Sequence, residues 1–256
     1  MKRILLTISY DGSNYFGWQK QKDPEIITVE GTLERGLRKL FPNQEIECMG
    51  TSRTDRGVHA LGQTAVIDVD TTIPMERIPL AILPFLPDDI VVVAAEEVRS
   101  NFHPRYECIK KTYEYQILNT RIRNPLFRNY SEFVPLKLDI LKMEVAAKAF
   151  IGTFDFRAFC AMGSTVTSMV RSVFECTVER QGDFVIIRIT GDGFLYNMVR
   201  IIAGTLIYVG LGKILPEDIP FIIKSGDRTK AGMTASPQGL KLMQIYYDSE
   251  RKSIDR

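Results

Sequence analysis

The chain has 256 residues, of which 45% are hydrophobic and 25% are charged, and its formal net charge is +2. These values are typical of a soluble globular protein and argue against a disordered or fibrous one. The most apolar stretch, 198–211, contains Arg200, which argues against a membrane span, and the apolar run at the N-terminus is too short for a signal peptide.

The sequence gives no sign of a metal site or a disulfide framework. Its four cysteines have no paired C-x-x-C spacing, and its only histidines are His59 and His103. This pattern disfavours zinc and favours the reducing cytoplasm.

The first hundred residues predict one small α+β unit. The expected elements are a strand at 2–10, a helix at 28–40, strands at 45–49 and 63–69, a helical stretch at 74–85 and a strand at 90–98. The first helix carries Val29, Leu33 and Leu37 on one stripe, and the strand at 63–69 alternates apolar and polar residues. The order β-α-β-β-α-β is the split pattern of ferredoxin-like domains.

The rest of the chain repeats this order without repeating the sequence. The expected elements are a strand at 111–118, a short segment at Phe133, a helix from Asp139 to Phe150 closed by Gly152, a hairpin of strands at 170–180 and 184–190, helices at 195–209 and 216–224, and a strand at 241–247. We therefore predict an α+β fold of two ferredoxin-like halves, 1–105 and 106–256, with mostly antiparallel sheets backed by helices. The same architecture occurs in common readers of single-stranded RNA.

The stretch Gly50–Gln63 carries one carboxylate, Asp55, between the guanidinium groups of Arg53 and Arg56, with glycines on either side. Because predicted strands precede and follow it, Asp55 is expected on a loop held at both ends by a sheet, where functional groups are often mounted. Nearby cations favour the ionised form of a carboxylate, which suits a nucleophile or an electrostatic stabiliser better than a general acid. An ion-paired turn with capping glycines explains the same residues equally well.

Positive charge is local rather than global. Residues 105–128 contain six Lys or Arg against two Glu, whereas 88–97 contains four acids and no base. The asymmetry indicates a polyanionic partner on one face, and the alternative is a solvated charged loop.

Two aromatic stretches accompany these charges. In 10–20, Tyr15, Phe16 and Trp18 offer stacking surfaces for bases and Lys20 offers a phosphate contact, although packing over a sheet end explains the aromatic residues better. In 101–106, the aromatic residues Phe102 and Tyr106 flank His103 and Arg105. All four are candidate RNA contacts, and a hydrogen-bonded structural role is favoured for the histidine.

Two residues of the second half are candidate site residues. Tyr113 lies on a predicted strand, where tyrosine is usually part of the core but can also stack on a base. Arg200 lies in an apolar helix, and an arginine so embedded requires an anionic partner. Asp55 is the carboxylate that lacks another obvious partner, and pairing the two would assemble one site from both halves.

Taken together, these residues resemble the A-type tRNA pseudouridine synthases. The resemblance rests on Gly50–Ala60, Tyr10–Gly12 with Gly17–Gln19, Phe102–Arg105, Lys111–Tyr115, Asp155–Phe159, Gly193–Arg200 and Gly239–Leu240. These segments span nearly the whole chain in the family's order. Asp192 departs from the family pattern, where asparagine is usual, and Ser236 and Gln238 also vary it.

The resemblance implies isomerisation of uridine to pseudouridine in the anticodon stem-loop of tRNA, at nucleotides 38, 39 and 40, by a homodimer that needs no cofactor or metal. Asp55 would be the nucleophile in a catalytic cleft between the halves, and Arg200 would hold it ionised. Tyr113 would stack on the target uracil, and Arg53 would help to displace that base. Further expected RNA contacts are Phe102, His103, Arg105, Tyr106, Lys111 and Arg171.

Two other classes of function remain open from the residues alone. A non-catalytic RNA-binding module would use Tyr15, Trp18 and the basic run, but it leaves Arg200 unexplained. A glycoside-type hydrolase would need a second carboxyl group about 5–10 Å from the first with a raised pKa. Asp155 and Asp192 are the candidates for that group.

Overall fold

The computed structural model describes residues 1–163 and 166–248, which divide into two compact units. Unit 1 contains Met1–Ile109 and the chain from Leu242 onward, and unit 2 contains Lys110–Lys241. Most of the last strand, which was predicted as part of the second half, belongs to unit 1. The predicted second half also included 164–165 and 249–256, which lie outside the described residues.

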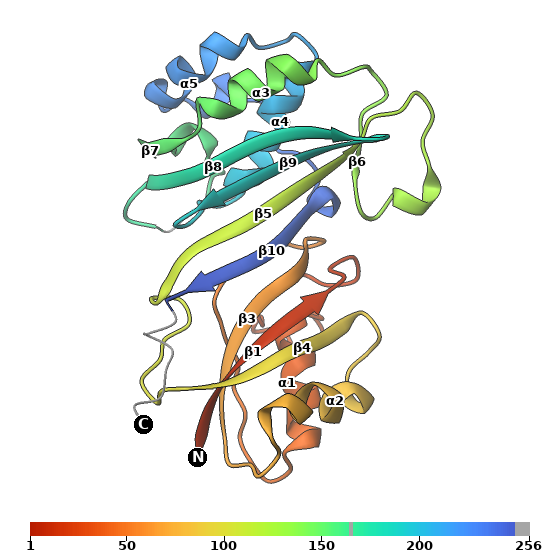
Figure 1. Cartoon of the computed structure of the whole chain (residues 1–256), viewed down its shortest axis with the longest axis vertical. Coiled ribbons are helices and arrows are strands. Elements are labelled where there is room, and N and C mark those ends of the chain that lie inside the picture. The colour runs from red at the N-terminus through yellow and green to blue at the C-terminus, as the bar shows by residue number, and fades with distance from the viewer. Residues whose placement is uncertain (164–165, 249–256) are drawn as a thin grey trace. The chain divides into compact units, whose positions relative to one another are not determined.

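Unit 1 is a sheet backed by two helices (Figure 1). Its strands are β1 (Lys2–Tyr10), β2 (Met49–Gly50), β3 (His59–Val69), β4 (Ile90–Val98) and β10 (Leu240–Tyr247). β1 lies in the centre, antiparallel to β3 and β4, so that Ile4 is opposite both Ile67 and Glu97. β2 and β10 both neighbour β3. The predicted β-α-β-β-α-β order is confirmed for this unit.

The helices of unit 1 follow from capping and apolar periodicity. α1 (Val29–Leu40) begins after Thr28, whose Oγ1 accepts a hydrogen bond from Gly31 N at 3.3 Å. Its stripe of Val29, Leu33 and Leu37 is fully buried. The stretch predicted at 74–85 is helical but broken: α2 (Ile78–Ile82) lies between 3₁₀ turns at Met75–Arg77 and Leu83–Phe85. Its prolines lack the N–H groups that a continuous helix needs.

The strand predicted at 45–49 is misplaced, because pairing begins only with β2 at Met49. The alternation of polar and apolar residues has another cause. Ile46 packs in the core, and the N–H of Cys48 donates to a Glu34 carboxylate oxygen at 3.0 Å instead of to a neighbouring strand. A helix side chain has thus replaced a strand as the hydrogen-bond partner.

Unit 2 repeats the plan of a helix-backed antiparallel sheet (Figure 1). Its strands are β5 (Cys108–Leu118), β6 (Glu132–Phe133), β7 (Gly152–Asp155), β8 (Val170–Gln181) and β9 (Phe184–Gly191). The order is β5-β9-β8-β7, and β6 runs parallel to the end of β5. The predicted hairpin of β8 and β9 is confirmed, with Gly182 at φ 58° in its turn, whereas β7 was not predicted.

The helices of unit 2 are α3 (Ile140–Lys148), α4 (Met198–Gly210) and α5 (Ile219–Ser225). α3 begins after Asp139, as predicted, because the Asp139 carboxylate accepts a hydrogen bond from Lys142 N. α4 is buried on nearly every side, which makes it the core helix of the unit. Further 3₁₀ turns lie at Pro125–Phe127, Arg157–Phe159, Pro216–Asp218, Arg228–Lys230 and Pro237–Gly239.

The predicted α+β class, with mostly antiparallel sheets backed by helices, is confirmed. Within the described residues, no helix has both the length and the apolar composition needed to cross a membrane.

Candidate active site

The Asp55 loop, Thr51–Val58, connects β2 to β3, and buried side chains brace the backbone where the loop begins. Thr51 N donates to Thr64 O at 2.9 Å. The Gln63 side chain, fully buried, donates from Nε2 to Ser52 O at 2.6 Å and accepts from Ser52 N at 3.3 Å. A buried amide that satisfies both backbone groups of one residue fixes the direction of the chain there. The predicted support of the loop by strands at both ends is confirmed.

The tip of the loop is tied to β1 and to the segment that follows β1. Thr54 O accepts from Trp18 N at 3.1 Å, and Thr54 Oγ1 shares a 2.7 Å hydrogen bond with the Tyr10 hydroxyl. After Asp55 the chain turns back, because Val58 N donates to Asp55 O at 3.1 Å. Asp55 itself is half-buried, so its carboxylate is mounted on a fixed backbone and still reaches the surface of unit 1.

The segment Asp11–Lys20, here called the aromatic loop, packs directly on the Asp55 loop through glycines. A Cβ atom on Gly12 would lie 2.0 Å from the Val58 carbonyl oxygen, and one on Gly17 would lie 2.4 Å from that of Thr54. Gly17 also has φ +88°, a conformation that side chains rarely adopt. These contacts explain the Gly12 and Gly17 positions of the motif as close approaches of two backbones.

The same packing agrees with the favoured interpretation of the aromatic residues of this loop, which is that they pack in the protein rather than stack on bases. Tyr15 is 4% exposed and Trp18 is 1% exposed, so both belong to the core. The Tyr15 hydroxyl donates to Asp89 Oδ1 at 2.5 Å, and burial together with this hydrogen bond raises the pKa of Tyr15. Of the three aromatic residues Tyr15, Phe16 and Trp18, only Phe16 is exposed. The Arg56 guanidinium lies over its ring, with Cζ 4.1 Å from the ring centroid.

Two buried carboxylates of α1 hold both flanks of this assembly, and sequence reasoning missed them. Glu34, 2% exposed, accepts from Lys20 Nζ at 2.7 Å, from Arg38 Nη2 at 3.1 Å and from Cys48 N at 3.0 Å. Glu30 accepts from Lys20 N at 2.7 Å. Burial raises the pKa of Glu30, and the hydrogen bond to Glu34 raises the pKa of Lys20. The sequence signal was available: acids on the apolar side of a helix need hydrogen-bond or cationic partners.

Lys20 is the last residue of the aromatic loop, and Cys48 directly precedes β2, which leads into the Asp55 loop. Glu34 therefore links the end of the aromatic loop to the start of β2. Lys20 Nζ is thus paired with Glu34, but its side chain is half exposed, so its phosphate contact stays a prediction. The two arginines that flank Asp55 in sequence, Arg53 and Arg56, are both exposed.

The turn at 102–107 separates its candidate residues into core and surface. Phe102 is fully buried against Leu5, Val66 and Val98, with the Tyr247 ring at 5.2 Å. Its predicted RNA contact is therefore corrected, because the ring has no accessible surface. Arg105 is exposed and Tyr106 is 81% exposed, and both remain candidates.

His103 organises this turn. Its Nδ1 accepts from Tyr106 N at 3.3 Å, its ring lies 4.1 Å from the Tyr106 ring, and its backbone N–H donates to Glu107 at 2.7 Å. Glu107 also pairs with Arg99. The favoured structural role of His103 agrees with these contacts.

Tyr113 and Lys111 lie on β5, in unit 2. Tyr113 is opposite Ile189 of β9 and is 6% exposed, with the edge of its ring against Phe194 at 5.3 Å and 88°. Phe194 belongs to the Gly193–Arg200 motif, so two of the predicted motifs meet here. Lys111 is opposite Gly191 and is half-buried.

Arg200 lies in the first turn of α4, which begins later than the predicted 195. Asn197 precedes the helix in the left-handed conformation, at φ 60°, and its Oδ1 accepts from Arg200 Nη1 at 2.7 Å. Arg200 Nε donates to Ala235 O at 2.8 Å. These two bonds fix the plane of the guanidinium within unit 2. A residue at positive φ is uncommon and is often found at functional sites.

The comparisons with known proteins agree with these motifs. A family model described as tRNA pseudouridine synthase matches residues 6–107 and 146–248. A tRNA pseudouridine synthase A of Thermoanaerobacter sp. is 49% identical and one of Caldicellulosiruptor saccharolyticus is 47% identical, each over 96% of this chain and 100% of its own length. A tRNA pseudouridine synthase A 2 of Clostridium tetani is 47% identical over 96% of this chain and 99% of its own.

This chain belongs to the tRNA pseudouridine synthase family. The predicted family resemblance is thereby confirmed. A solved structure, a crystal structure of a Cbf5-Nop10-Gar1 complex, contains a chain that was also matched. The match covers 98% of the present chain and 60% of the chain in the complex, but its TM-score of 0.36 and its 13% identity are too low to support an inference. The matched ranges contain the Asp55 loop and Arg200, whereas Tyr113 lies between them.

Asp192, the departure noted in the sequence, has a structural partner. Asp192 Oδ1 accepts from Ser172 N at 3.0 Å, and Asp192 N donates to Ser172 O at 3.0 Å. Arg171 precedes this pair, next to Gly193, and donates from Nη1 to Ser168 O at 2.9 Å and to Val170 O at 2.6 Å.

The second carboxyl group that a hydrolase would need is not evident at the two predicted positions. Asp155 is exposed and pairs with Arg157 at 3.1 Å, and Asp192 is exposed and hydrogen-bonded to the backbone. Neither has the apolar surroundings that a general acid requires. Within residues 1–163 and 166–248, no group of three or more His, Cys, Asp or Glu is placed to hold a metal ion.

Proposed function

We propose that this pseudouridine synthase acts on uridines of the anticodon stem-loop of tRNA, with Asp55 as its nucleophile. The family gives the reaction, in which uridine in tRNA is isomerised to pseudouridine. The observation that carries the assignment to Asp55 is the mounting of its half-buried carboxylate on a loop whose backbone is hydrogen-bonded before, at and after its tip. Such fixed placement is what a nucleophile needs.

The reaction conserves all atoms of the nucleotide. The bond from ribose C1′ to uracil N1 breaks, the base turns, and C1′ bonds to C5. C5 then loses its proton and N1 gains one. Asp55 can assist by attacking C1′, by attacking C6 of the uracil or by promoting elimination, and all three routes need a carboxylate rather than a carboxylic acid. Fixed cations favour that form, which is the role we assign to Arg200.

Arg200 is proposed to pair with Asp55 in the folded protein. What supports this is the fixed guanidinium plane, set by Asn197 and Ala235, in the first turn of an otherwise apolar helix. A guanidinium held in advance loses little side-chain entropy when it binds a carboxylate.

Tyr113 is proposed to stack on the target uracil and to take the C5 proton. Its ring is already oriented by the edge contact with Phe194, which supports a stacking surface of fixed direction. Arg53, exposed and two residues before Asp55, is proposed to fill the space that the displaced base leaves.

The remaining contacts are proposed to bind the phosphate backbone. Arg105 and Tyr106 at the tip of their turn are accessible for this role, with His103 holding the turn beneath them. Lys111 and Arg171 are the proposed contacts of unit 2. Phosphate contacts supply most of the affinity and little of the sequence preference.

The decisive experiment uses bulk tRNA tritiated at uracil C5. Release of tritium by the wild type reports isomerisation, binding without release would indicate a non-catalytic module, and free uracil would indicate hydrolysis. Asp55→Asn should abolish release and keep the tRNA affinity within a few-fold, because the phosphate contacts lie on other residues. Turnover by purified Asp55→Asn above the trace level would refute the nucleophile assignment.

A homodimer in the cytoplasm is the proposed working form. Edge strands support dimerisation, since β4 ends the unit 1 sheet and β7 ends the unit 2 sheet, and Val93 on β4 is 51% exposed. The four cysteines are free thiols, and the proposed compartment is a reducing one. Sedimentation at micromolar concentration tests the dimer, and a monomer there would count against it.

A further inference from the structure

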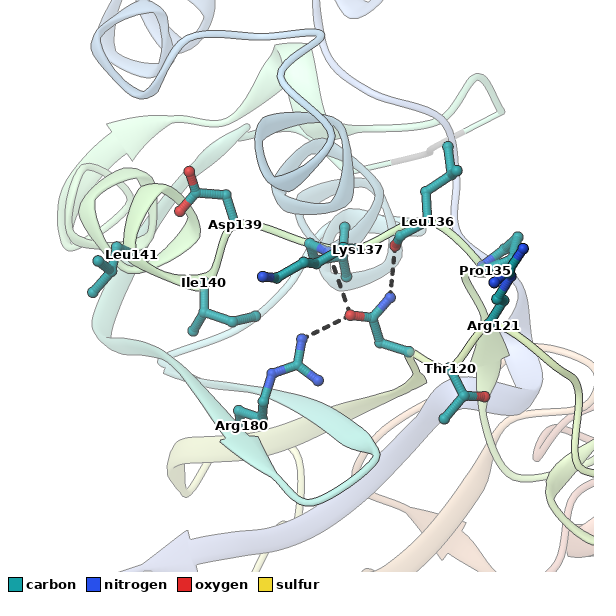
Figure 2. Close-up of a pocket in the computed structure, with 11 residues that line it drawn as sticks. Thr120, Arg121, Pro135, Leu136, Lys137, Asp139, Ile140, Leu141 and Arg180 are labelled. Atoms are coloured by element: carbon teal, nitrogen blue, oxygen red, sulfur yellow. Dashed lines mark hydrogen bonds between the residues drawn. The ribbon is translucent and has the colours of Figure 1, made fainter.

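A pocket of about 970 Å³ opens in unit 2 where β5 ends (Figure 2). Its walls come from the segment after β5, from the chain that leads into α3 and from Arg180 on β8. The volume lies within the range of ligand-binding pockets. None of its residues is used in the proposed reaction.

One side chain, Asn119, builds the floor of this pocket. Its Nδ2 donates to Val134 O at 2.8 Å and to Leu136 O at 2.7 Å. Its Oδ1 accepts from Leu138 N at 3.3 Å and from Arg180 Nη2 at 2.7 Å. An amide has two donor hydrogens and two lone pairs, so Asn119 is fully satisfied and holds both walls and the Arg180 guanidinium in place.

The charge in the pocket is positive. Arg121, Lys137 and Arg180 all line it and are exposed (Figure 2). Within the described residues, Arg121 and Lys137 have no acidic partner, and Arg180 is bonded to a neutral amide. The one lining carboxylate, Asp139, caps α3 and pairs with Lys142 at 3.3 Å. Three cations therefore line one pocket whose single carboxylate is already paired with Lys142, and the net positive charge favours an anionic ligand.

The lining distinguishes a phosphate contact from recognition of a base. Apart from Asp139, the residues around the pocket are cationic, polar or aliphatic, and none is aromatic, so no aromatic stacking surface for a base is present. Exposed Leu136 and Leu141 form an aliphatic rim. Arg and Lys side chains that contact only phosphates bind the RNA backbone without any preference for the nucleotide sequence.

The pocket lies away from the proposed reaction centre within unit 2. Asn119 follows the end of β5, six residues beyond Tyr113, and an extended strand of that length spans about 20 Å. A stem of several nucleotides covers such a distance, so one RNA could present its target base at Tyr113 and a phosphate at the pocket.

We propose that this basic pocket, formed by Arg121, Lys137 and Arg180 on the Asn119 floor, binds backbone phosphates of the substrate tRNA at a distance from the target uridine. The proposal rests on the proposed function for the identity of the RNA. It assigns to the pocket a share of the affinity and no part of the chemistry.

The test compares two double variants of the full chain. Arg121→Gln/Lys137→Gln removes two charges from the pocket, and Lys148→Gln/Lys224→Gln removes two exposed charges of unit 2 outside it. The dissociation constant for full-length tRNA is measured over a range of salt concentrations. The pocket variant should bind several-fold more weakly and lower the slope of log K against log salt by about two, whereas the control stays near the wild type.

Equal losses in the two variants would mean a general effect of net charge and would overturn the proposal, as would an unchanged slope in the pocket variant. Thermal protection of the wild type by millimolar pyrophosphate, with no change of slope in the pocket variant, would assign the pocket to a small anion instead. Tritium release by the wild type tests the reaction separately. A wild type without turnover but with pocket-dependent binding would refute the proposed function and leave this site standing.

Discussion

The Asp55 loop and the turn at 102–107 both carry motif residues of unit 1, but the structure holds them differently. The Asp55 loop is bonded to β3, to β1 and to the aromatic loop, and backbones approach it so closely that only glycine fits at Gly12 and Gly17. The turn is anchored below, by buried Phe102 and by the Glu107 contacts, while Arg105 and Tyr106 extend into solvent.

The difference matches what each segment is proposed to do. A reacting group must be held to within a fraction of an ångström, because a misplacement of about 1 Å can cost about 10²-fold in rate. A phosphate contact made by a long exposed side chain tolerates far more freedom, since it is electrostatic and non-directional. Substitutions that loosen the Asp55 loop should therefore reduce the rate constant, and those in the turn should reduce affinity.

Among substitutions outside the proposed reacting groups, the largest effect is expected from Gly17→Ala. The new Cβ would lie 2.4 Å from the Thr54 carbonyl oxygen, and neither backbone can move without shifting the residue before Asp55. The positive φ adds about 1–3 kcal/mol of strain. We expect loss of about 10²-fold or more in the single-turnover rate at saturating tRNA, measured by tritium release.

Gly212→Ala is the matched control for this substitution. Gly212 also has positive φ, +71°, but nothing lies within 4 Å of its would-be Cβ. It should lower the thermal stability through strain alone and leave the rate constant of the folded protein unchanged. If both variants lost rate in proportion to their stability, close packing on the Asp55 loop would not be the cause.

A smaller effect is expected from Glu34→Gln. The amide can still accept a hydrogen bond from Cys48 N, but it cannot balance the charges of Lys20 and Arg38. Because those two cations are about half exposed, they can be rehydrated, and the loss of unfolding free energy should be about 1–3 kcal/mol rather than the larger cost of a fully buried pair. The rate constant should also fall, with little change in tRNA affinity.

Asp68→Asn controls for loss of a partly buried ion pair, since Asp68 pairs with Arg3 between β1 and β3, away from the Asp55 loop. It should lower stability without lowering the rate constant.

The pH dependence of stability adds a second check on the role of Glu34. The pKa of Lys20 is raised by Glu34, so the pair's contribution is complete below the unfolded pKa of lysine and is lost as the pH rises through the folded value. The stability difference between wild type and Glu34→Gln should narrow at high pH.

How far the sequence predicts this architecture depends on which signal was available. Ile90–Val98 is a strand as predicted, and the α1 stripe is buried, because apolar periodicity reports burial directly. The start of α4 was predicted too early, since the left-handed Asn197 leaves no mark in an apolar run. The strand predicted at 45–49 failed because its alternation reflects packing against α1 rather than strand pairing.

For the site, the motifs identified which segments matter but not which side chains are accessible. Phe102 was a predicted RNA contact and stacking by Trp18 was left open in sequence, yet both are buried, and only contacts with distant segments decide this. Glu34 was missed for the converse reason. Its function depends on Lys20 and Cys48, residues that lie fourteen positions away on either side and that are brought to it only by the fold.

The smallest effect is expected from Arg105→Ala, which should change the tRNA affinity and not the rate constant, the reverse of Gly17→Ala. Arg105 is exposed at the tip of its turn, while the anchors of that turn are Phe102, His103 and Glu107, so its removal should leave the fold intact. Loss of one phosphate contact should weaken tRNA binding several-fold and reduce the salt slope by about one. At saturating tRNA the single-turnover rate should change little.

The matched control is Lys39→Ala, which removes an exposed cation in the last turn of α1. It changes the net charge equally and should leave both the tRNA affinity and the salt slope near those of the wild type. A reduced rate at saturation in Arg105→Ala would mean that the turn positions the reacting groups as well. The two segments would then share one role, and the contrast drawn from their hydrogen bonding would fail.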